Sequence, residues 1–177
     1  MTNAELAVLS LLSEEPGHGY ELEAKIEARG MRDWTEIGFS SIYAILKKLE
    51  KAGWVEAEQA RSVGQGAPRK VFRITAAGRQ AQLSAVLEAL TTPGRPNASL
   101  LLGLSNLPIL PRDQALEALG QYRAALEERI QQLLTRADAQ QPLPDFVAAM
   151  FDYSTTMIAT ELAWLNEYMQ KMETQHG

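Results

Sequence analysis

Basic side chains, the groups that pair with phosphates, concentrate in one segment of this acidic 177-residue chain. The net charge is −5, yet residues 40–80 carry eight Lys or Arg against three Asp or Glu. Residues 81–177 hold all of the acidic excess, with six basic and eleven acidic side chains. This distribution predicts a nucleic-acid-binding face within residues 40–80 of an otherwise acidic protein.

An amphipathic helix over residues 39–52 is predicted to position the first part of this face. Its apolar positions recur at helical spacing and would be buried: Ile42, Ile45, Leu46 and Leu49. The opposite face is small, hydroxylic or basic, a composition that fits base edges in a major groove and phosphates beside it. We expect Ser40, Ser41, Ala44 and Lys47 at the groove, and Tyr43 and Lys48 at phosphates. Alternatively, Tyr43 only packs, or the whole face is merely solvated.

A basic hairpin follows this helix. Residues 54–62 and 70–75 are β-type stretches, and the Gly- and Pro-containing link 63–68 joins them. Its tip is flanked by cations at Arg61, Arg69 and Lys70. A hairpin this small needs packing against helices, so we expect a wing whose cations lie over the DNA backbone or minor groove.

The helices around this pair are predicted from the same kind of pattern. Helices over residues 3–13 and 19–29 would pack on residues 39–52, the second through Tyr20, Leu22 and Ile26. Thr75 is expected to cap a helix over residues 76–90. Gly78 within that helix indicates close packing, since glycine there costs about 1 kcal/mol relative to alanine. The fold class is mainly α: a winged helix-turn-helix over residues 1–91, with three helices and a two-stranded wing.

Three segments of this region together resemble the PadR family of bacterial transcriptional regulators. They are GYEL at 19–22, SIYAILKKLEKAG at 41–53 and GAPRKVFRITAAG at 66–78. The wing of that family usually has Tyr where Phe72 stands. The resemblance implies sequence-specific DNA binding, most simply by a repressor.

Residues 97–177 are expected to form a second, helical, coiled-coil-like domain after the Pro/Gly-containing boundary at 91–96. A helix capped by Asp113 carries a 3-4-3-4 seam from Leu116 to Ala137. A last helix over residues 145–173 has two apolar rows, one with Phe146 and Tyr153, the other with Phe151 and Leu165. Two apolar rows need more than one neighbour, which favours a homodimer through these helices over a closed monomeric bundle.

This half is similar to the longer, AphA-like branch of the PadR family, through residues 98–102 and ELAWL at 161–165. That resemblance implies a dimerisation domain, two winged helices about one DNA turn apart and an inverted-repeat operator. Several family members are released by small hydrophobic or aromatic compounds. Phe151, Met157, Trp164 and Tyr168 could line such an effector pocket, or could simply be core.

The sequence offers little support for catalysis. The chain has no Cys, and its only histidines are His18 and His176, so we expect no enzyme, metal site or cofactor. Neither a signal peptide nor a membrane-spanning segment is expected, which favours a cytoplasmic protein. A winged-helix module that binds protein, without sequence-specific DNA binding, is the alternative from another class.

Overall fold

The computed structural model describes residues 1–35, 37–38, 42–60, 69–94 and 97–174. The chain divides into two compact units, Met1–Gly94 and Arg95–Gly177, and each is described by itself. The limits 1–91 and 97–177 stay a prediction as the bounds of independently folding domains.

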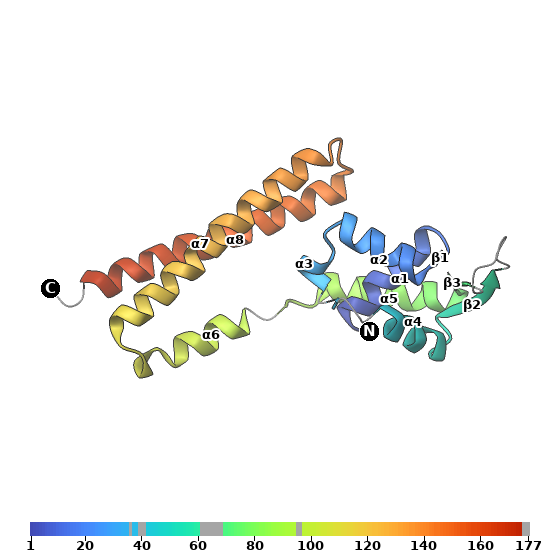
Figure 1. The fold of residues 1–177 in the computed structure, drawn as a ribbon, viewed down its shortest axis with the longest axis horizontal. Helices are drawn as coiled ribbons and strands as arrows, with labels where there is room; N and C mark the ends of the chain where they lie inside the picture. The colour runs from blue at the N-terminus through green and yellow to red at the C-terminus, as the bar shows by residue number, and fades with distance from the viewer. Residues whose placement is uncertain (36, 39–41, 61–68, 95–96, 175–177) are drawn as a thin grey trace. The chain divides into compact units, whose positions relative to one another are not determined.

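The first unit is a group of helices with a small antiparallel sheet (Figure 1). Its helices are α1 (Asn3–Glu14), α2 (Gly19–Ala28), α3 (Arg32–Thr35), α4 (Ile42–Lys51) and α5 (Ala76–Thr91). The strands β1 (Gly17–His18), β2 (Val55–Ala60) and β3 (Arg69–Ile74) lie in the order β1-β3-β2. The winged-helix fold is therefore confirmed. Two short elements were not predicted: α3 lies in an expected connection, and β1 is too short to show a strand period.

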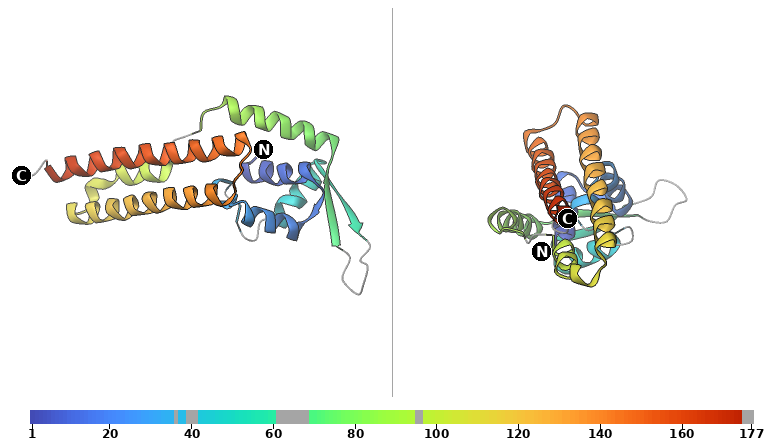
Figure 2. Two further views of the ribbon diagram at one scale, coloured as in Figure 1. Left: turned by 90° about the horizontal axis from the view of Figure 1, so that it is seen from above. Right: turned by 90° about the vertical axis from the view of Figure 1, so that its left-hand side faces the viewer.

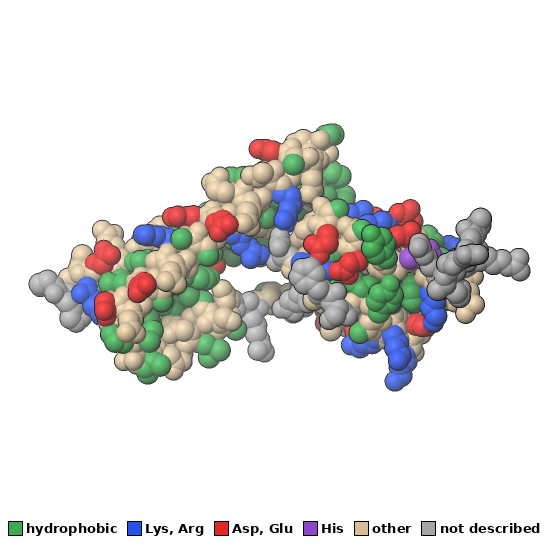
Figure 3. Space-filling view, viewed as in Figure 1, with side chains coloured by type: hydrophobic (Ala, Val, Ile, Leu, Met, Phe, Trp, Pro, Cys, Tyr) green, Lys and Arg blue, Asp and Glu red, His purple; other side chains and the backbone are tan. Residues whose placement is uncertain are grey.

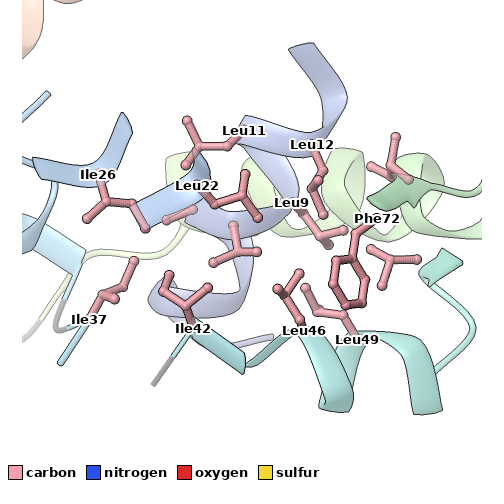
Figure 4. Close-up of a cluster of buried hydrophobic side chains, with 14 of the residues drawn as sticks. Leu9, Leu11, Leu12, Leu22, Ile26, Ile37, Ile42, Leu46, Leu49 and Phe72 are labelled. Carbon is pink, nitrogen blue, oxygen red and sulfur yellow. The ribbon is translucent and has the colours of Figure 1, made fainter. Parts of the chain in front are cut away.

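A single apolar core holds the wing to the helices. Figure 4 shows Leu9, Leu46, Leu49 and Phe72 converging from α1, α4 and β3. All four are at least nine-tenths buried, and burying a side chain of this size stabilises the fold by about 1.5–3 kcal/mol. The ring of Phe72 thus fixes the base of the wing against α4.

Tyr20 was expected in this core, and that expectation is wrong. Its side chain is 76% exposed, whereas Leu22 and Ile26 are buried. Successive helical residues are about 100° apart, so positions 20 and 22 point to opposite sides of α2. The buried residue at the start of α2 is Gly19.

The start of α5 meets the turn between α4 and β2 at very close range. The Thr75 hydroxyl accepts a hydrogen bond from Gly78 N at 3.0 Å, which confirms the predicted N-cap, and donates one to Gly53 O at 2.7 Å. A Cβ atom on Gly78 would lie 2.0 Å from Trp54 O. The close packing inferred from a glycine in this helix is therefore present.

The second unit is built on two long helices, α7 (Arg112–Ala139) and α8 (Asp145–Thr174), which lie side by side and antiparallel (Figures 1 and 2). The short helix α6 (Ala98–Ser105) and the 3-10 turn η1 (Leu107–Ile109) precede them. The buried cluster between these two helices consists of Leu119, Leu126, Leu165 and Met169. Asp113 does not cap α7 as expected: Pro111 holds the cap position, and Asp113 lies in the first turn.

A polar contact ties α6 to the helix pair. The Tyr122 hydroxyl of α7 donates to Glu161 Oε1 of α8 at 2.7 Å and accepts from Asn97 Nδ2 at 3.0 Å. Asn97 also caps α6 by accepting from Leu100 N. Burial, reinforced by the Glu161 carboxylate, raises the pKa of Tyr122 to about 12.

The two apolar rows of α8 have different environments. The row from Val147 to Met169 packs toward α7 and is buried or half-buried. The other row is exposed in the isolated chain: Phe146, Met150, Tyr153, Met157 and Trp164 are 42–71% exposed.

Among the described helices, none is both long and apolar enough to cross a membrane.

Candidate nucleic-acid interface

Helix α4 has one buried face and one basic face, as a helix that enters a DNA groove requires. Ile42, Leu46 and Leu49 are buried against the core. Ala44, Lys47 and Lys51 lie on the exposed face, and neither lysine makes an ion pair within the described residues. In Figure 3, Lys and Arg side chains gather along the edge of the first unit where α4 lies.

Tyr43 occupies the flank of α4 that faces α2. Its side chain is 67% exposed, yet a Cβ atom on Gly19 would lie 2.8 Å from Cε1 of the ring. Glycine at the start of α2 therefore lets the Tyr43 ring approach the backbone closely. The same Cβ position lies 3.2 Å from the hydroxyl oxygen, so the outer end of the ring lies over the start of α2.

Lys48 occupies the flank that faces α1, where it already has an acidic partner. Its ammonium pairs with Oε1 of Glu5, a residue only 5% exposed. Burial by itself would raise the pKa of Glu5, but hydrogen bonds from Lys48 and from Thr2 N, with the Lys48 charge, lower it overall. Glu5 is therefore ionised at neutral pH.

Arg32 connects α2 with Ile37, which follows α3. This mostly buried side chain pairs with Glu23 and Glu27 of α2. It also donates from Nη1 to Ile37 O at 2.6 Å. The arrangement ties Ile37 to α2 through charge-assisted hydrogen bonds.

The base of the wing is tied to the start of α2. Strands β2 and β3 pair in register from Val55 opposite Ile74 to Ala60 opposite Arg69. His18 Nδ1 lies 2.9 Å from Lys70 O, and because a carbonyl only accepts, the ring donates this bond. The side chain of Lys70 is exposed beside it. The base of the wing is thus tied to the start of α2 on the first unit.

Residues 8–83 match the model of the transcriptional regulator PadR-like family. The predicted resemblance to the PadR family is confirmed over these residues, which are 76 of the 177 in the chain. The PadR-like family is one of transcriptional regulators, not of enzymes. A comparison with curated proteins found no match.

Solved PadR structures resemble the chain over almost all of its length. Bacillus subtilis PadR in complex with operator DNA is 18% identical, with a TM-score of 0.74 over 95% of this chain and 98% of that one. The same protein in complex with p-coumaric acid gives 0.75, at 18% identity, over 97% and 99%. The protein smu.1604c from Streptococcus mutans UA159 gives 0.69, at 21% identity, over 97% and 100%. At such identities these likenesses establish the PadR fold, helical C-terminal region included.

Some of the predicted contact residues of this PadR-like chain cannot be placed. Ser40, Ser41 and Arg61 lie outside the described residues, as does the tip of the wing between β2 and β3. Arg69 is placed by its backbone as the first residue of β3. The roles assigned to these residues remain predictions.

Two residues of the PadR-like unit were missed by the sequence interpretation. Tyr20 is exposed at the start of α2, next to the glycine that contacts Tyr43, and strict helical geometry could have shown that it does not share a face with Leu22. Glu5 could have been found from the sequence, because Thr2 at the cap and Glu5 at the third helical position together form a capping box. Its pairing with Lys48 has no local signal.

The four residues named as a possible effector pocket do not share one surface of the PadR-like chain. Phe151 is half-buried on the side of α8 that packs on α7, whereas Met157 and Trp164 are exposed. Trp164 and Tyr168 stack with ring centroids 5.3 Å apart and planes within 7°. Whether they bind a ligand stays a matter for proposal.

Proposed function

We propose that this PadR-family regulator binds an inverted-repeat operator as a homodimer and represses transcription. The observation that carries the proposal is α4, whose apolar face is buried while Lys47 and Lys51 remain unpaired on the outer face within the described chain. Base edges would meet Ser40, Ser41, Ala44 and Lys47. Backbone phosphates would meet Tyr43 and the wing, and Lys48 lies beside them on α4. Such a protein would act in the cytoplasm, where bacterial DNA lies.

Selection of bound sites from random DNA tests sequence-specific binding directly. We expect enrichment of an inverted repeat whose half-sites are about one helical turn apart. Lys47→Ala should then weaken operator binding at least several-fold, whereas Lys171→Ala, which removes an exposed lysine of α8, should not. Weak binding without sequence preference at physiological salt would instead favour a winged-helix module that docks protein.

The wing has its own test. Replacing Arg69 and Lys70 together with Ala should weaken binding to all DNA and reduce the slope of log affinity against log salt by about 1–2 units for each subunit. Phosphate contacts are independent of sequence, so operator and random DNA should be affected alike. An unchanged slope would remove the wing from the interface.

The exposed row of α8 supports the homodimer. Five large apolar side chains on one helix face exceed what a monomer normally exposes, and a second copy is the simplest cover. Phe146→Ser with Tyr153→Ser should shift the protein to monomer in sedimentation velocity, while Gln170→Ser, at an exposed polar position of α8, should not. A wild-type chain that sediments as a monomer would favour the closed bundle.

Release by a small aromatic effector is the last part of the proposal. The p-coumaric acid complex of Bacillus subtilis PadR shows that a related fold accepts a phenolic acid. The Trp164–Tyr168 stack provides an apolar aromatic plane for such a ligand. Phenolic compounds should change Trp fluorescence in the wild type and not in Trp164→Phe. No fluorescence response to any of a panel of phenolic compounds would favour the alternative that these aromatic residues only form part of the helical core.

A further inference from the structure

Glu5 is the one acidic or basic side chain buried among the residues that the structure describes. It lies in the first turn of α1, and both carboxylate oxygens are engaged. Oε2 accepts a hydrogen bond from Thr2 N at 2.9 Å, and Oε1 pairs with Lys48 Nζ. A buried carboxylate is costly unless it is paired, so its partner is held firmly.

That partner belongs to the helix proposed to meet DNA. The side chain of Lys48 is 67% exposed, but its ammonium reaches back from α4 to α1. Lys47 and Lys51, on the same helix, make no ion pair within the described residues. One of the three lysines of α4 is therefore neutralised inside the protein.

We propose that Glu5 acts as an internal competitor for DNA phosphate that removes Lys48 from the charge α4 presents to the DNA backbone. This inference rests on the proposed DNA-binding function. If Lys48 left Glu5 for a phosphate, it would leave a nearly buried carboxylate unpaired close to the polyanion. Moving Lys48 from Glu5 to a phosphate neutralises one negative charge and exposes another, so the net neutralisation does not increase. Lys48 therefore contributes surface to the interface but no salt-dependent affinity.

The expected effect of removing the competitor follows from counterion release. Each phosphate neutralised by a cation contributes about 0.9 to the slope of log affinity against log salt. Freeing Lys48 should therefore steepen the slope by about 0.9 for each subunit, or about 1.8 for a dimer. At about 0.15 M salt this corresponds to roughly fivefold tighter binding for each subunit. Because phosphates carry no sequence information, operator and random DNA should gain equally.

Glu5→Gln is the direct test in the full-length chain. Glutamine also suits this position of a capping box, so the bond from Thr2 N can persist while the charge is lost. Glu15→Gln is the matched control: it removes one charge at the other end of α1, where the carboxylate pairs with Lys25 of α2. We expect the slope to steepen in Glu5→Gln and to stay unchanged in Glu15→Gln.

Lys48→Met completes a double-mutant cycle. In the wild-type background it should leave the slope nearly unchanged, and in Glu5→Gln it should cancel the gain. A wild-type slope that falls by about 0.9 per subunit on Lys48→Met would overturn the inference, even if Glu5→Gln does not fold. An unchanged slope in a folded Glu5→Gln would overturn it as well. Failure of the wild type to enrich any DNA site would overturn the proposed function instead.

Discussion

Replacing Gly78 with alanine should destabilise the first unit, although the same change in a helix interior normally stabilises. Alanine is favoured over glycine there by about 1 kcal/mol. At this position, however, the new methyl group would lie 2.0 Å from Trp54 O and 2.9 Å from Cγ1 of Ile74. The first contact is with backbone, which cannot turn aside as a long side chain can.

The magnitude follows from what must move. Ordinary contact begins near 3.4 Å, so α5 and the Trp54 carbonyl must separate by more than an ångström. Overpacking of this kind costs about 1–3 kcal/mol. The same carbonyl accepts from Thr75 N at 3.0 Å, and losing that hydrogen bond costs about 1 kcal/mol more. After subtracting the helix preference, we expect a net loss of about 1–3 kcal/mol in the free energy of unfolding.

Urea unfolding followed by tryptophan fluorescence can isolate this unit. The chain has three tryptophans, and in a Trp164→Phe background only Trp34 and Trp54 report, both from the first unit. Trp54 adjoins the altered contact. The midpoint should fall while the dependence on urea concentration stays constant, as expected for a change in stability alone.

Ser84→Ala is the control, because it changes an exposed position of the same helix to the same residue. Its effect should stay within about 0.5 kcal/mol. If Gly78→Ala were as stable as the wild type or more stable, the close approach of α5 to Trp54 would be refuted, and with it our explanation of the glycine.

Three further outcomes are expected. Tyr122→Phe should abolish the last tyrosine ionisation, near pH 12, measured by absorbance at 295 nm. Because the pKa of Tyr122 is raised in the folded protein, its contact stabilises the fold below the ordinary tyrosine pKa of 10, and this stabilisation is lost as the pH rises through 12. If the transition near pH 12 persisted in the variant, its assignment to Tyr122 would be refuted. Glu5→Gln should reduce the dependence of stability on acid pH. Because the pKa of Glu5 is lowered in the folded protein, its ionised carboxylate stabilises the fold above pH 4.5, and this stabilisation is lost as the pH falls through the lower folded value. Equal losses in the free energy of unfolding from pH 6 to 3.5 in variant and wild type would contradict this. Thr75→Ala should cost about 1–2 kcal/mol, measured by urea unfolding, and Thr75→Ser should restore most of it, since the hydroxyl caps α5 and donates to Gly53 O; equal effects would exclude the cap.

The sequence alone was sufficient for the elements whose signals are local. The spacing of Ile42, Leu46 and Leu49 predicted the buried face of α4, because helical period is a property of neighbouring residues. The cap at Thr75 and the close contact at Gly78 could also be predicted from local sequence. Threonine is favoured at the N-cap of a helix, and glycine is disfavoured in its interior unless close packing requires it. The wing followed from two β-type stretches joined by Gly and Pro.

Only the tertiary structure decided which groups meet across the chain. Pairing of Glu5 with Lys48 joins residues 43 positions apart, and no local pattern encodes it. The same holds for Tyr122 with Glu161, and for the choice of which apolar row of α8 packs on α7. Local periodicity fixes the face of a helix but not its neighbour. The sequence thus determined a basic helix and wing, whereas the tertiary structure decided which of its cations remain available to DNA.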